Sequence, residues 1–237
     1  MQAKILSNQI HIALSRTRSE KNSRILTFPN VLIIDPEKIS TQKAFITEKI
    51  SQYPKLLLEV GCGKGEYTIA MARNNPEMLC MGIDLKGPRI HDAAMKGLEP
   101  ESIENAFFLK GLVEHLDQIL PHNTVDELWL PFSDPYPKKR HIKKRLVAPS
   151  FLDIHRNIIK PNGKLHLKTD QQHLYEYALE SIVENGGQLI AHTPNLYASD
   201  LADESTGIKT TFEQKFLAEG ITIKYICFQL DKKVVTP

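Results

Sequence analysis

Hydrophobic runs alternate with amphipathic stretches along most of this chain. Each apolar run predicts a strand, and most are followed by a stretch with the spacing of a helix that buries one face. We expect strands at residues 56–60, 78–84, 105–110, 125–132, 164–169, 188–192 and 221–230. We expect helices at residues 36–53, 67–74, 88–98, 113–120, 149–159, 172–185 and 212–219. Strands alternating with helices predict an α/β fold whose mostly parallel sheet is covered on both faces.

Two segments fall outside this alternation. Residues 1–24 hold five basic residues and one acid without sustained periodicity. We therefore expect a basic N-terminal arm at residues 1–24, followed by a single domain at residues 25–237. The connection at residues 193–211 is long and polar, which is typical of a functional or mobile loop.

The composition, 41% hydrophobic and 24% charged, is typical of a soluble globular protein. No stretch approaches the roughly 20 apolar residues of a membrane span, and the first residues lack the apolar core of a signal peptide. Cys62, Cys80 and Cys227 lie far apart, without disulfide or metal-ligand spacing. We therefore expect a cytoplasmic protein with no membrane partner and no bound metal.

The net charge of +2 conceals an uneven distribution. Residues 134–170 contain ten Lys and Arg against three acids, so the remainder of the chain is net negative. Six of these cations lie within residues 138–145. A basic segment in an otherwise mildly acidic chain favours a localised contact with a polyanion.

A glycine-rich turn, Glu59-Val-Gly-Cys-Gly-Lys-Gly65, joins the first of these strands to its helix. Gly61, Gly63 and Gly65 tolerate positive φ and let a ligand lie against the backbone, and the opening helix directs free N–H groups to the same point. The next strand ends in Asp84, placed to bind a ribose. The G-x-G-x-G spacing differs from the dinucleotide fingerprint and argues against a dehydrogenase. It is similar to the S-adenosylmethionine site of class I methyltransferases.

The segment Phe132-Ser-Asp-Pro-Tyr-Pro-Lys-Lys-Arg-His-Ile-Lys-Lys-Arg145 follows another strand end. Pro135 and Pro137 fix φ and stiffen the turn, so the Asp134 carboxylate and the Tyr136 ring are held in place. Ligands of such sheets bind at the carboxyl ends of the strands. Four such ends carry acids or glycines: Glu59 to Gly65, Asp84, Asp134 and Asp170. The cations that follow Asp134 can neutralise phosphates in a salt-dependent contact.

Five segments together resemble the bacterial tRNA (guanine-N7)-methyltransferase family: residues 59–65, 82–84, 132–141, 168–170 and 211–213. The similarity covers roughly residues 25–230 and is most specific at residues 134–141. It implies a Rossmann-like class I methyltransferase fold with a seven-stranded sheet and an antiparallel C-terminal strand. It also implies methyl transfer from S-adenosylmethionine to a guanine N7 in tRNA, at the variable-loop position 46.

The resemblance also assigns residues to roles. For S-adenosylmethionine the implied contacts are Glu59, Gly61, Gly63, Gly65, Asp84 and Leu112. Asp134 takes the catalytic position. For tRNA the implied contacts are Lys138, Asp170, Thr210, Thr211, Phe212 and Glu213, and the adjoining cations Lys139, Arg140 and Arg145 extend this set. No metal ligand is implied.

Three positions depart from the family pattern. Asp84 stands where Glu is usual, and Pro131 stands where an Asn often precedes the Phe-Ser-Asp block. The Asp or Asn commonly found beside adenine is missing after the third strand, where the sequence is Lys110-Gly-Leu-Val113. Adenine contacts are then expected from the backbone or from Glu114, the nearest acid.

Guanine N7 already carries a lone pair, so no base is needed, and positioning supplies most of the acceleration. A carboxylate beside the acceptor base favours the positive charge that develops on its ring and accepts hydrogen bonds from its N1–H and amino groups. We expect this carboxylate to be Asp134, with Asp170 as a second candidate. Tyr136 is then placed to stack on or abut the base.

Two other functions stay open at this point. An amino-methyltransferase is suggested by Ser133-Asp-Pro-Tyr136, which partly matches the Asp/Asn-Pro-Pro-Tyr turn of such enzymes, and the methylated nucleoside would decide. A tRNA-binding protein without catalysis is suggested by the missing adenine-side acid beside an intact basic segment. Binding of tRNA without binding of S-adenosylmethionine would favour it. The sequence leaves monomer and homodimer equally open.

Overall fold

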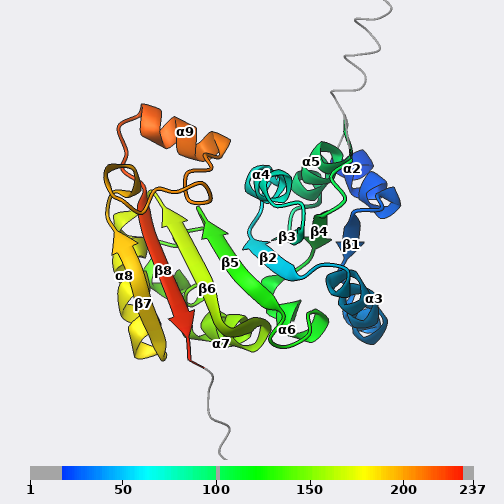
Figure 1. The fold of residues 1–237 in the computed structure, drawn as a ribbon, viewed down its shortest axis with the longest axis horizontal. Helices are drawn as coiled ribbons and strands as arrows, with labels where there is room; N and C mark the ends of the chain where they lie inside the picture. The colour runs from blue at the N-terminus through cyan, green and yellow to red at the C-terminus, as the bar shows by residue number, and fades with distance from the viewer. Residues whose placement is uncertain (1–17, 100–101, 232–237) are drawn as a thin grey trace, which may run out of the picture.

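The computed structural model describes residues 18–99 and 102–231, which form one sheet with helices on both faces (Figure 1). The sheet has eight strands in the order β1-β4-β3-β2-β5-β6-β8-β7. Their bounds are β1 Val31–Ile33, β2 Lys55–Val60, β3 Met78–Asp84, β4 Ala106–Lys110, β5 Val125–Pro131, β6 Ile159–Thr169, β7 Gly187–Thr193 and β8 Lys224–Leu230. β8 runs antiparallel to β6 and β7, and the other pairs are parallel. The mostly parallel sheet with an antiparallel C-terminal strand is confirmed.

The predicted count of seven strands is too small by one. The additional strand, β1, pairs with β4 at the edge of the sheet. It has three residues, all apolar and of intermediate burial, and is shorter than the apolar runs that mark the other parallel strands. By contrast, all seven residues of β3 are buried. A parallel strand covered on both faces reads as a continuous apolar run, which is why the prediction for residues 78–84 matches its bounds.

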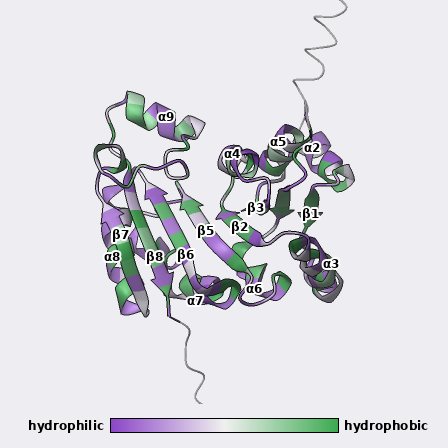
Figure 2. Ribbon diagram, in the orientation of Figure 1, coloured by the Kyte–Doolittle hydropathy of each residue, from purple (hydrophilic) through white to green (hydrophobic). Residues whose placement is uncertain are grey.

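The helices are α2 Arg18–Arg24, α3 Ile39–Ser51, α4 Glu66–Asn74, α5 Gly87–Leu98, α6 Leu116–Ile119, α7 Pro149–Ile158, α8 Gln172–Glu184 and α9 Thr211–Ala218. Short 3-10 helices are η1 Ile25–Thr27, η2 Pro36–Lys38, η3 Val113–His115, η4 Lys139–Lys144 and η5 Leu196–Ala198. Buried side chains of α3, α6, α7 and α8 share one core, and those of α4 and α5 share the core of the opposite face. Figure 2 shows hydrophobic and hydrophilic residues together on α8, as expected of a helix with one buried side. Within residues 18–99 and 102–231, no helix has the length and apolar character needed to cross a membrane.

The N-terminal part of the described chain is folded against the domain. Residues 18–24, which we assigned to the basic arm, form α2, and α2 contacts α5. The Lys21 ammonium lies 2.5 Å from the Asp92 carboxylate of α5. The rest of the predicted arm, residues 1–17, lies outside the described residues, and the division at residue 25 stays a prediction.

The long connection at residues 193–211 has structure of its own. It contains η5, and Leu196 is buried in the core shared with α4 and α5. Further along, Asp203 and Thr206 exchange hydrogen bonds, each donating its N–H to the other side chain at 2.7 Å. We expected this loop to be functional or mobile. Its buried Leu196 and its internal hydrogen bonds argue against mobility.

The parallel register brings the carboxyl ends of six strands to one edge. Val60 pairs with Ile83, and Asp84 pairs with Lys110. After β2 the chain builds β3 and β4 on one side of it, then returns to place β5 on the other. Such a reversal leaves a crevice at the strand ends, where ligands of doubly wound sheets bind.

Candidate active site

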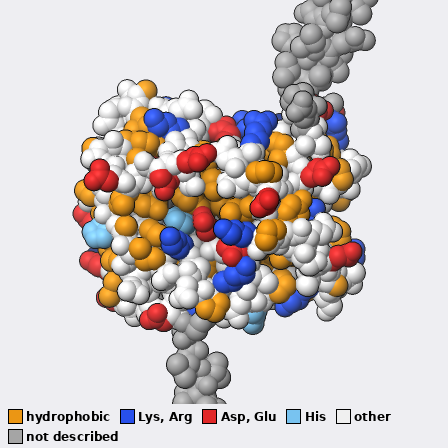
Figure 3. Space-filling view, viewed as in Figure 1, with side chains coloured by type: hydrophobic (Ala, Val, Ile, Leu, Met, Phe, Trp, Pro, Cys, Tyr) orange, Lys and Arg blue, Asp and Glu red, His pale blue; other side chains and the backbone are white. Residues whose placement is uncertain are grey.

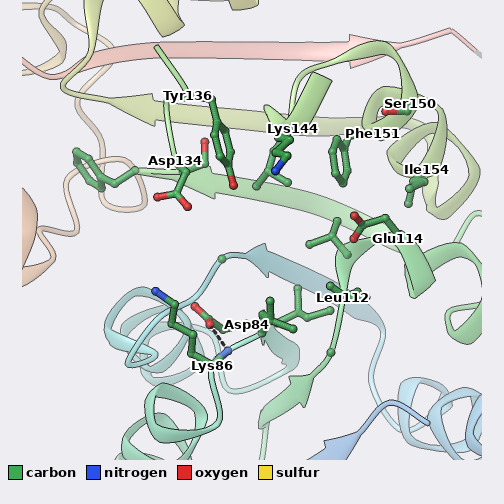
Figure 4. Close-up of a pocket in the computed structure, with 18 of the residues that line it drawn as sticks. Asp84, Lys86, Leu112, Glu114, Asp134, Tyr136, Lys144, Ser150, Phe151 and Ile154 are labelled. Carbon is green, nitrogen blue, oxygen red and sulfur yellow. Dashed lines mark hydrogen bonds between the residues drawn. The ribbon is translucent and has the colours of Figure 1, made fainter. Parts of the chain in front are cut away.

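A cavity of about 530 Å³ opens where the strands β2, β3, β4 and β5 end. Its lining includes Gly61, Ile83, Asp84, Leu85, Lys86, Arg89, Gly111, Leu112, Val113, Glu114, Phe132, Ser133, Asp134, Tyr136, Lys143, Lys144, Leu146, Ser150, Phe151 and Ile154. Figure 4 shows Asp84 and Leu112 on one side of the cavity and Asp134, Tyr136 and Lys144 on the other. The cavity therefore unites three of the four strand ends that the sequence predicted to meet, those at Gly61, Asp84 and Asp134.

The glycine turn has the backbone conformation that the sequence requires. Gly61 has a φ of 80° and Gly63 a φ of 55°, and a Cβ at either position would meet no atom within 4 Å. The space beside the turn is therefore open to a ligand. Gly65 differs, because a Cβ there would lie 2.7 Å from the Cβ of Ala93. Gly65 lets α4 begin close to α5, and only Gly61 of the three lines the cavity.

Asp84 ends β3 as a largely buried carboxylate. It accepts hydrogen bonds from the Gly63 N–H at 3.1 Å and from the Lys86 N–H at 2.7 Å. The Arg89 guanidinium lies 3.5 Å from the same carboxylate. A carboxylate has about four acceptor sites, so Asp84 is fixed in place and can still accept from a hydroxyl. This geometry suits the ribose contact expected of it.

Glu59 lies beneath the turn and does not line the cavity. Its side chain is 2% exposed, and it accepts hydrogen bonds from the Thr68 N–H at 2.9 Å and from the Thr68 hydroxyl. Burial raises the pKa of Glu59 to about 8 against the effect of these bonds, and the charges of Asp84 and Glu66 add to the rise. We expected Glu59 to contact the cofactor directly, but its buried side chain does not reach the cavity. Glu59 instead ties the first turn of α4 to the end of β2.

Two exposed leucines flank the cavity on the side of Asp84. Leu85 follows β3 and Leu112 follows β4, and both are exposed large apolar side chains that line the cavity. Ligand pockets combine such apolar surface with a few placed polar groups. The resemblance implied Leu112, whereas nothing in the sequence distinguished Leu85. Glu114 lines the same cavity and stays the candidate acid on the adenine side.

Asp134 reaches the cavity from a strained turn. Phe132 has a φ of 52° and Tyr136 a φ of 41°, values that are uncommon outside glycine and that gather at functional sites. Asp134 is exposed and lines the cavity (Figure 4). Partial burial raises the pKa of Tyr136, and the charge of Asp134 adds to the rise. The Tyr136 hydroxyl therefore keeps its proton at neutral pH, and its side-chain hydrogen bond with Asp134 is a further cause of the rise.

Arg145, which we expected to contact tRNA, lies inside the protein with 5% of its surface exposed. Its Nε donates to the Pro135 carbonyl at 2.9 Å and its Nη2 to the Tyr136 carbonyl at 3.1 Å. The guanidinium also lies 4.4 Å from the ring centroid of Tyr177 in α8. The prediction for Arg145 is wrong, because its donors face the backbone of the turn that carries Asp134.

The other cations of this segment lie at the surface. Lys138, Lys139 and Arg140 are exposed, and Lys143 and Lys144 line the cavity. On the face drawn in Figure 3, basic and acidic side chains are interspersed and form no single basic surface. The exposed cations lie directly after the turn of Asp134 in the chain. This is the position that the expected contact with a polyanion requires.

Residues 210–213 begin α9 and hold it in place. Thr210 caps the helix, since its hydroxyl accepts the Glu213 N–H at 3.3 Å. Thr211 donates its N–H and its hydroxyl to the carboxylate of Glu66, the first residue of α4, at 2.6 and 2.8 Å. Phe212 is 65% exposed. The other three residues make hydrogen bonds at the start of the helix. Phe212 makes none of these bonds, and most of its side chain is exposed to solvent.

Glu213 forms a buried ion pair with Lys168 of β6. Both side chains are 0% exposed, and the charged groups lie 2.6 Å apart. The Tyr197 hydroxyl donates to the same carboxylate at 2.6 Å, and Lys168 also donates to the carbonyls of Thr206 and Ile208. A direct contact between Glu213 and tRNA is contradicted by this burial. Glu213 instead fixes α9 and the preceding loop to the sheet.

Asp170 follows β6 at the same edge but does not line the cavity. Its carboxylate accepts from the Gln171 amide, and its carbonyl accepts from the Lys224 ammonium at 3.0 Å. Of the two carboxylates proposed for the acceptor base, only Asp134 reaches the cavity. Among the residues that the structure describes, no group of three or more His, Cys, Asp or Glu is arranged to hold a metal ion.

Sequence reasoning missed the contribution of α7. Ser150, Phe151 and Ile154 of this helix line the cavity opposite Leu112. Their spacing places them on one helical face, which was the available signal. That spacing predicts a buried face, but it does not tell whether the face meets a neighbouring element or a ligand.

Known proteins are similar to this chain in sequence. A family model described as "Putative methyltransferase" matches residues 54–226, so fold and site define a methyltransferase of the α/β class. The tRNA (guanine-N(7)-)-methyltransferase of Bacteroides fragilis is 34% identical and covers 93% of this chain and 88% of its own. The enzyme of the same name from Porphyromonas gingivalis is 39% identical over 74% of this chain and 71% of its own. This chain belongs to the tRNA (guanine-N7)-methyltransferase family.

Solved structures share the fold. A 30S ribosomal A1408 methyltransferase from an uncultured bacterium matches with a TM-score of 0.60 over 80% of this chain and 94% of that chain. The identity is 20%, so this similarity concerns the fold alone. The expected class I methyltransferase fold is confirmed.

Proposed function

We propose that this protein transfers a methyl group from S-adenosylmethionine to N7 of a guanine in tRNA. The observation that carries this proposal is that the Asp134 carboxylate, Asp84 and the turn at Gly61 face one cavity, with exposed cations next to Asp134 in the chain. Membership of the family supports the reaction and the class of substrate. The position in the tRNA, guanine 46, is the one implied by the resemblance.

The residues of the cavity fit S-adenosylmethionine. The open space beside Gly61 and Gly63 accepts a ligand against the backbone. Asp84 offers a fixed acceptor for ribose hydroxyls, and Leu85 and Leu112 offer apolar surface for an adenine ring. When bound, S-adenosylmethionine supplies a methyl group on a sulfonium, whose C–S bond breaks as the bond to guanine N7 forms.

Asp134 is the group that we assign to the acceptor base. Methyl transfer leaves positive charge on the guanine ring, and a carboxylate fixed beside that ring stabilises the charge as it develops. The same carboxylate accepts hydrogen bonds from the guanine N1–H and amino group, which orient N7. The neutral Tyr136 hydroxyl and ring form the adjoining part of the cavity. No general base is required, because N7 has no proton to lose.

The tRNA backbone is the partner that we assign to Lys138, Lys139 and Arg140. These exposed cations continue the chain directly after the turn of Asp134. Phosphate contacts of this kind position a nucleic acid and carry little sequence information. We assign Phe212 and Asp170 to the same substrate, because the family resemblance implies that they contact tRNA.

One experiment separates this proposal from its two alternatives. Purified protein is incubated with S-adenosylmethionine labelled in its methyl group and with unmodified bulk tRNA, and the digested nucleosides are separated. We expect the label in 7-methylguanosine, and its loss when guanine 46 of a single tRNA is replaced. Label in an N-methylated amine would establish the amino-methyltransferase. Binding of tRNA without label or donor binding by calorimetry would establish the non-catalytic protein.

We also propose that the reaction takes place in the cytoplasm. Cys62, Cys80 and Cys227 are all free and buried, which suits a reducing compartment. Fractionation of cells that express the tagged chain would test this location.

A further inference from the structure

We propose that Arg145 is a positioning residue that holds the turn carrying Asp134 in its reactive arrangement, an inference that rests on the proposed methyl transfer. Its guanidinium reaches neither the cavity nor the surface of the protein. It acts on the backbone of the turn, and through that backbone on the two side chains that line the cavity, Asp134 and Tyr136.

The turn has few hydrogen-bond donors of its own. Pro135 and Pro137 lack a backbone N–H, so two of the four residues from Asp134 to Pro137 offer a carbonyl and no donor. Buried or half-buried carbonyls need partners from elsewhere. Arg145 supplies them, with Nε on the Pro135 carbonyl and Nη2 on the Tyr136 carbonyl.

The turn also has a conformation that needs an external restraint. Tyr136 has a φ of 41° and precedes a proline. A residue before proline prefers an extended backbone, and positive φ is disfavoured for a bulky side chain. Strained backbone of this kind persists only when the surroundings over-determine it. The bond from Arg145 to the Tyr136 carbonyl acts on that very residue.

Arg145 is itself held from three directions. Its N–H donates to the Ile142 carbonyl at 3.0 Å, and its carbonyl accepts the Ala148 N–H at 2.9 Å just before α7. Its planar guanidinium lies over the ring of Tyr177 in α8. A lysine ammonium is a compact point charge that cannot reproduce both the flat contact and the forked pair of donors. The position therefore calls for arginine and not simply for a cation.

The test is Arg145→Lys, with Arg73→Lys on the exposed end of α4 as the matched change. We expect Arg145→Lys to lower kcat about 100-fold, the size of a displacement of about 1 Å at a reaction centre. We expect the affinity for tRNA and its dependence on salt to stay as in the wild type. Amide exchange across residues 132–142, which needs no activity, should accelerate in this variant and not in Arg73→Lys.

Two results would overturn the proposal. In Arg145→Gln, which removes the charge, a salt dependence of tRNA binding that falls by about one unit of slope, with kcat retained, would make Arg145 a phosphate contact. Unchanged kcat with unchanged amide exchange would show that the turn needs no such restraint. If Arg145→Lys fails to fold, Arg145→Ala assayed with added millimolar guanidinium replaces it, and absence of rescue then counts against the proposal. Failure of the wild type to form 7-methylguanosine would instead reject the proposed function, and amide exchange would still report on Arg145.

Discussion

The two sides of the cavity use their charged residues differently. On the donor side, Asp84 faces the cavity and backbone N–H groups hold it. On the acceptor side, Asp134 faces the cavity, but the motif residues Arg145 and Glu213 point into the protein. The glycine turn offers N–H donors, whereas the turn of Asp134 is interrupted by prolines. The comparison teaches that a charged side chain, Arg145, supplies hydrogen-bond donors to a turn whose prolines have none to give.

The largest effect is expected at the buried ion pair of the acceptor side. Glu213→Ala would leave the ammonium of Lys168 buried without its carboxylate, which lowers the free energy of unfolding by about 3–5 kcal/mol. Urea denaturation measures the loss. Lys215→Ala, which removes the exposed partner of Glu219, is the control and should change stability by about 0–1 kcal/mol. Similar losses in the two variants would mean that the pair does not hold α9.

Asp134→Ala tests the acceptor side at the cavity itself. Loss of a group that stabilises developing charge lowers kcat by about 10²–10³, while the affinity for S-adenosylmethionine should change little. Asp84→Ala should show the reverse pattern, with weaker donor binding as its main effect. Single-turnover methyl transfer and calorimetry measure the two quantities. If Asp134→Ala lowered turnover and the affinity for S-adenosylmethionine equally, Asp134 could not be assigned to the acceptor base rather than to the methyl donor.

Glu59→Gln tests the donor side through its dependence on pH. Because the pKa of Glu59 is about 8 in the folded protein and near 4.5 otherwise, the folded state holds a proton that the unfolded state has released between these values. Its contribution to stability is present below pH 4.5 and is lost as pH rises toward 8, by at most about 1.4 kcal/mol per pH unit. Glu59→Gln should therefore gain stability relative to the wild type between pH 5 and 8. Parallel curves for the two proteins would contradict the raised pKa.

The smallest effect is expected from the exposed cations. Replacing the three cations of residues 138–140 with glutamine should weaken tRNA binding, and its salt dependence should fall by about 0.7–0.9 in slope for each phosphate that is no longer neutralised. Filter binding over a range of salt concentrations measures this. The same change at Lys38, Lys55 and Arg73, which are exposed elsewhere, should have a weaker effect. An equal effect of both sets would show only a general attraction between charges.

Much of the fold follows from the sequence because the central strands are buried on both faces. The bounds of β3 match the prediction, whereas β1 escaped it, because an apolar run of three residues is too short to indicate a strand by itself. The segment 113–120, expected to be one helix, is a 3-10 turn followed by the four-residue α6. Over so short a segment, periods of about 3.0 and about 3.6 residues per turn give nearly the same pattern, so the pattern cannot choose between the two conformations.

The candidate site was predicted in part. Gly61, Asp84 and Asp134 were expected at strand ends, and they meet in the cavity because parallel strands end at one edge. The direction of a charged side chain was harder to predict. Arg145 is the last of six cations in an eight-residue run, and a count of charges does not tell which of them turns inward. That choice depends on Tyr177, which lies 32 residues further along the chain.

Glu66 joins two parts of the chain that are 145 residues apart in sequence. It directly follows the last glycine of the donor turn, and its carboxylate receives both donors of Thr211 at the start of α9. Any lifting of α9 would break both bonds and leave the Lys96 ammonium, 3.4 Å away, as the remaining partner of that carboxylate. The helix that follows the glycine turn and the start of α9 are therefore joined through one side chain, so a change in the position of either helix start bears directly on the other.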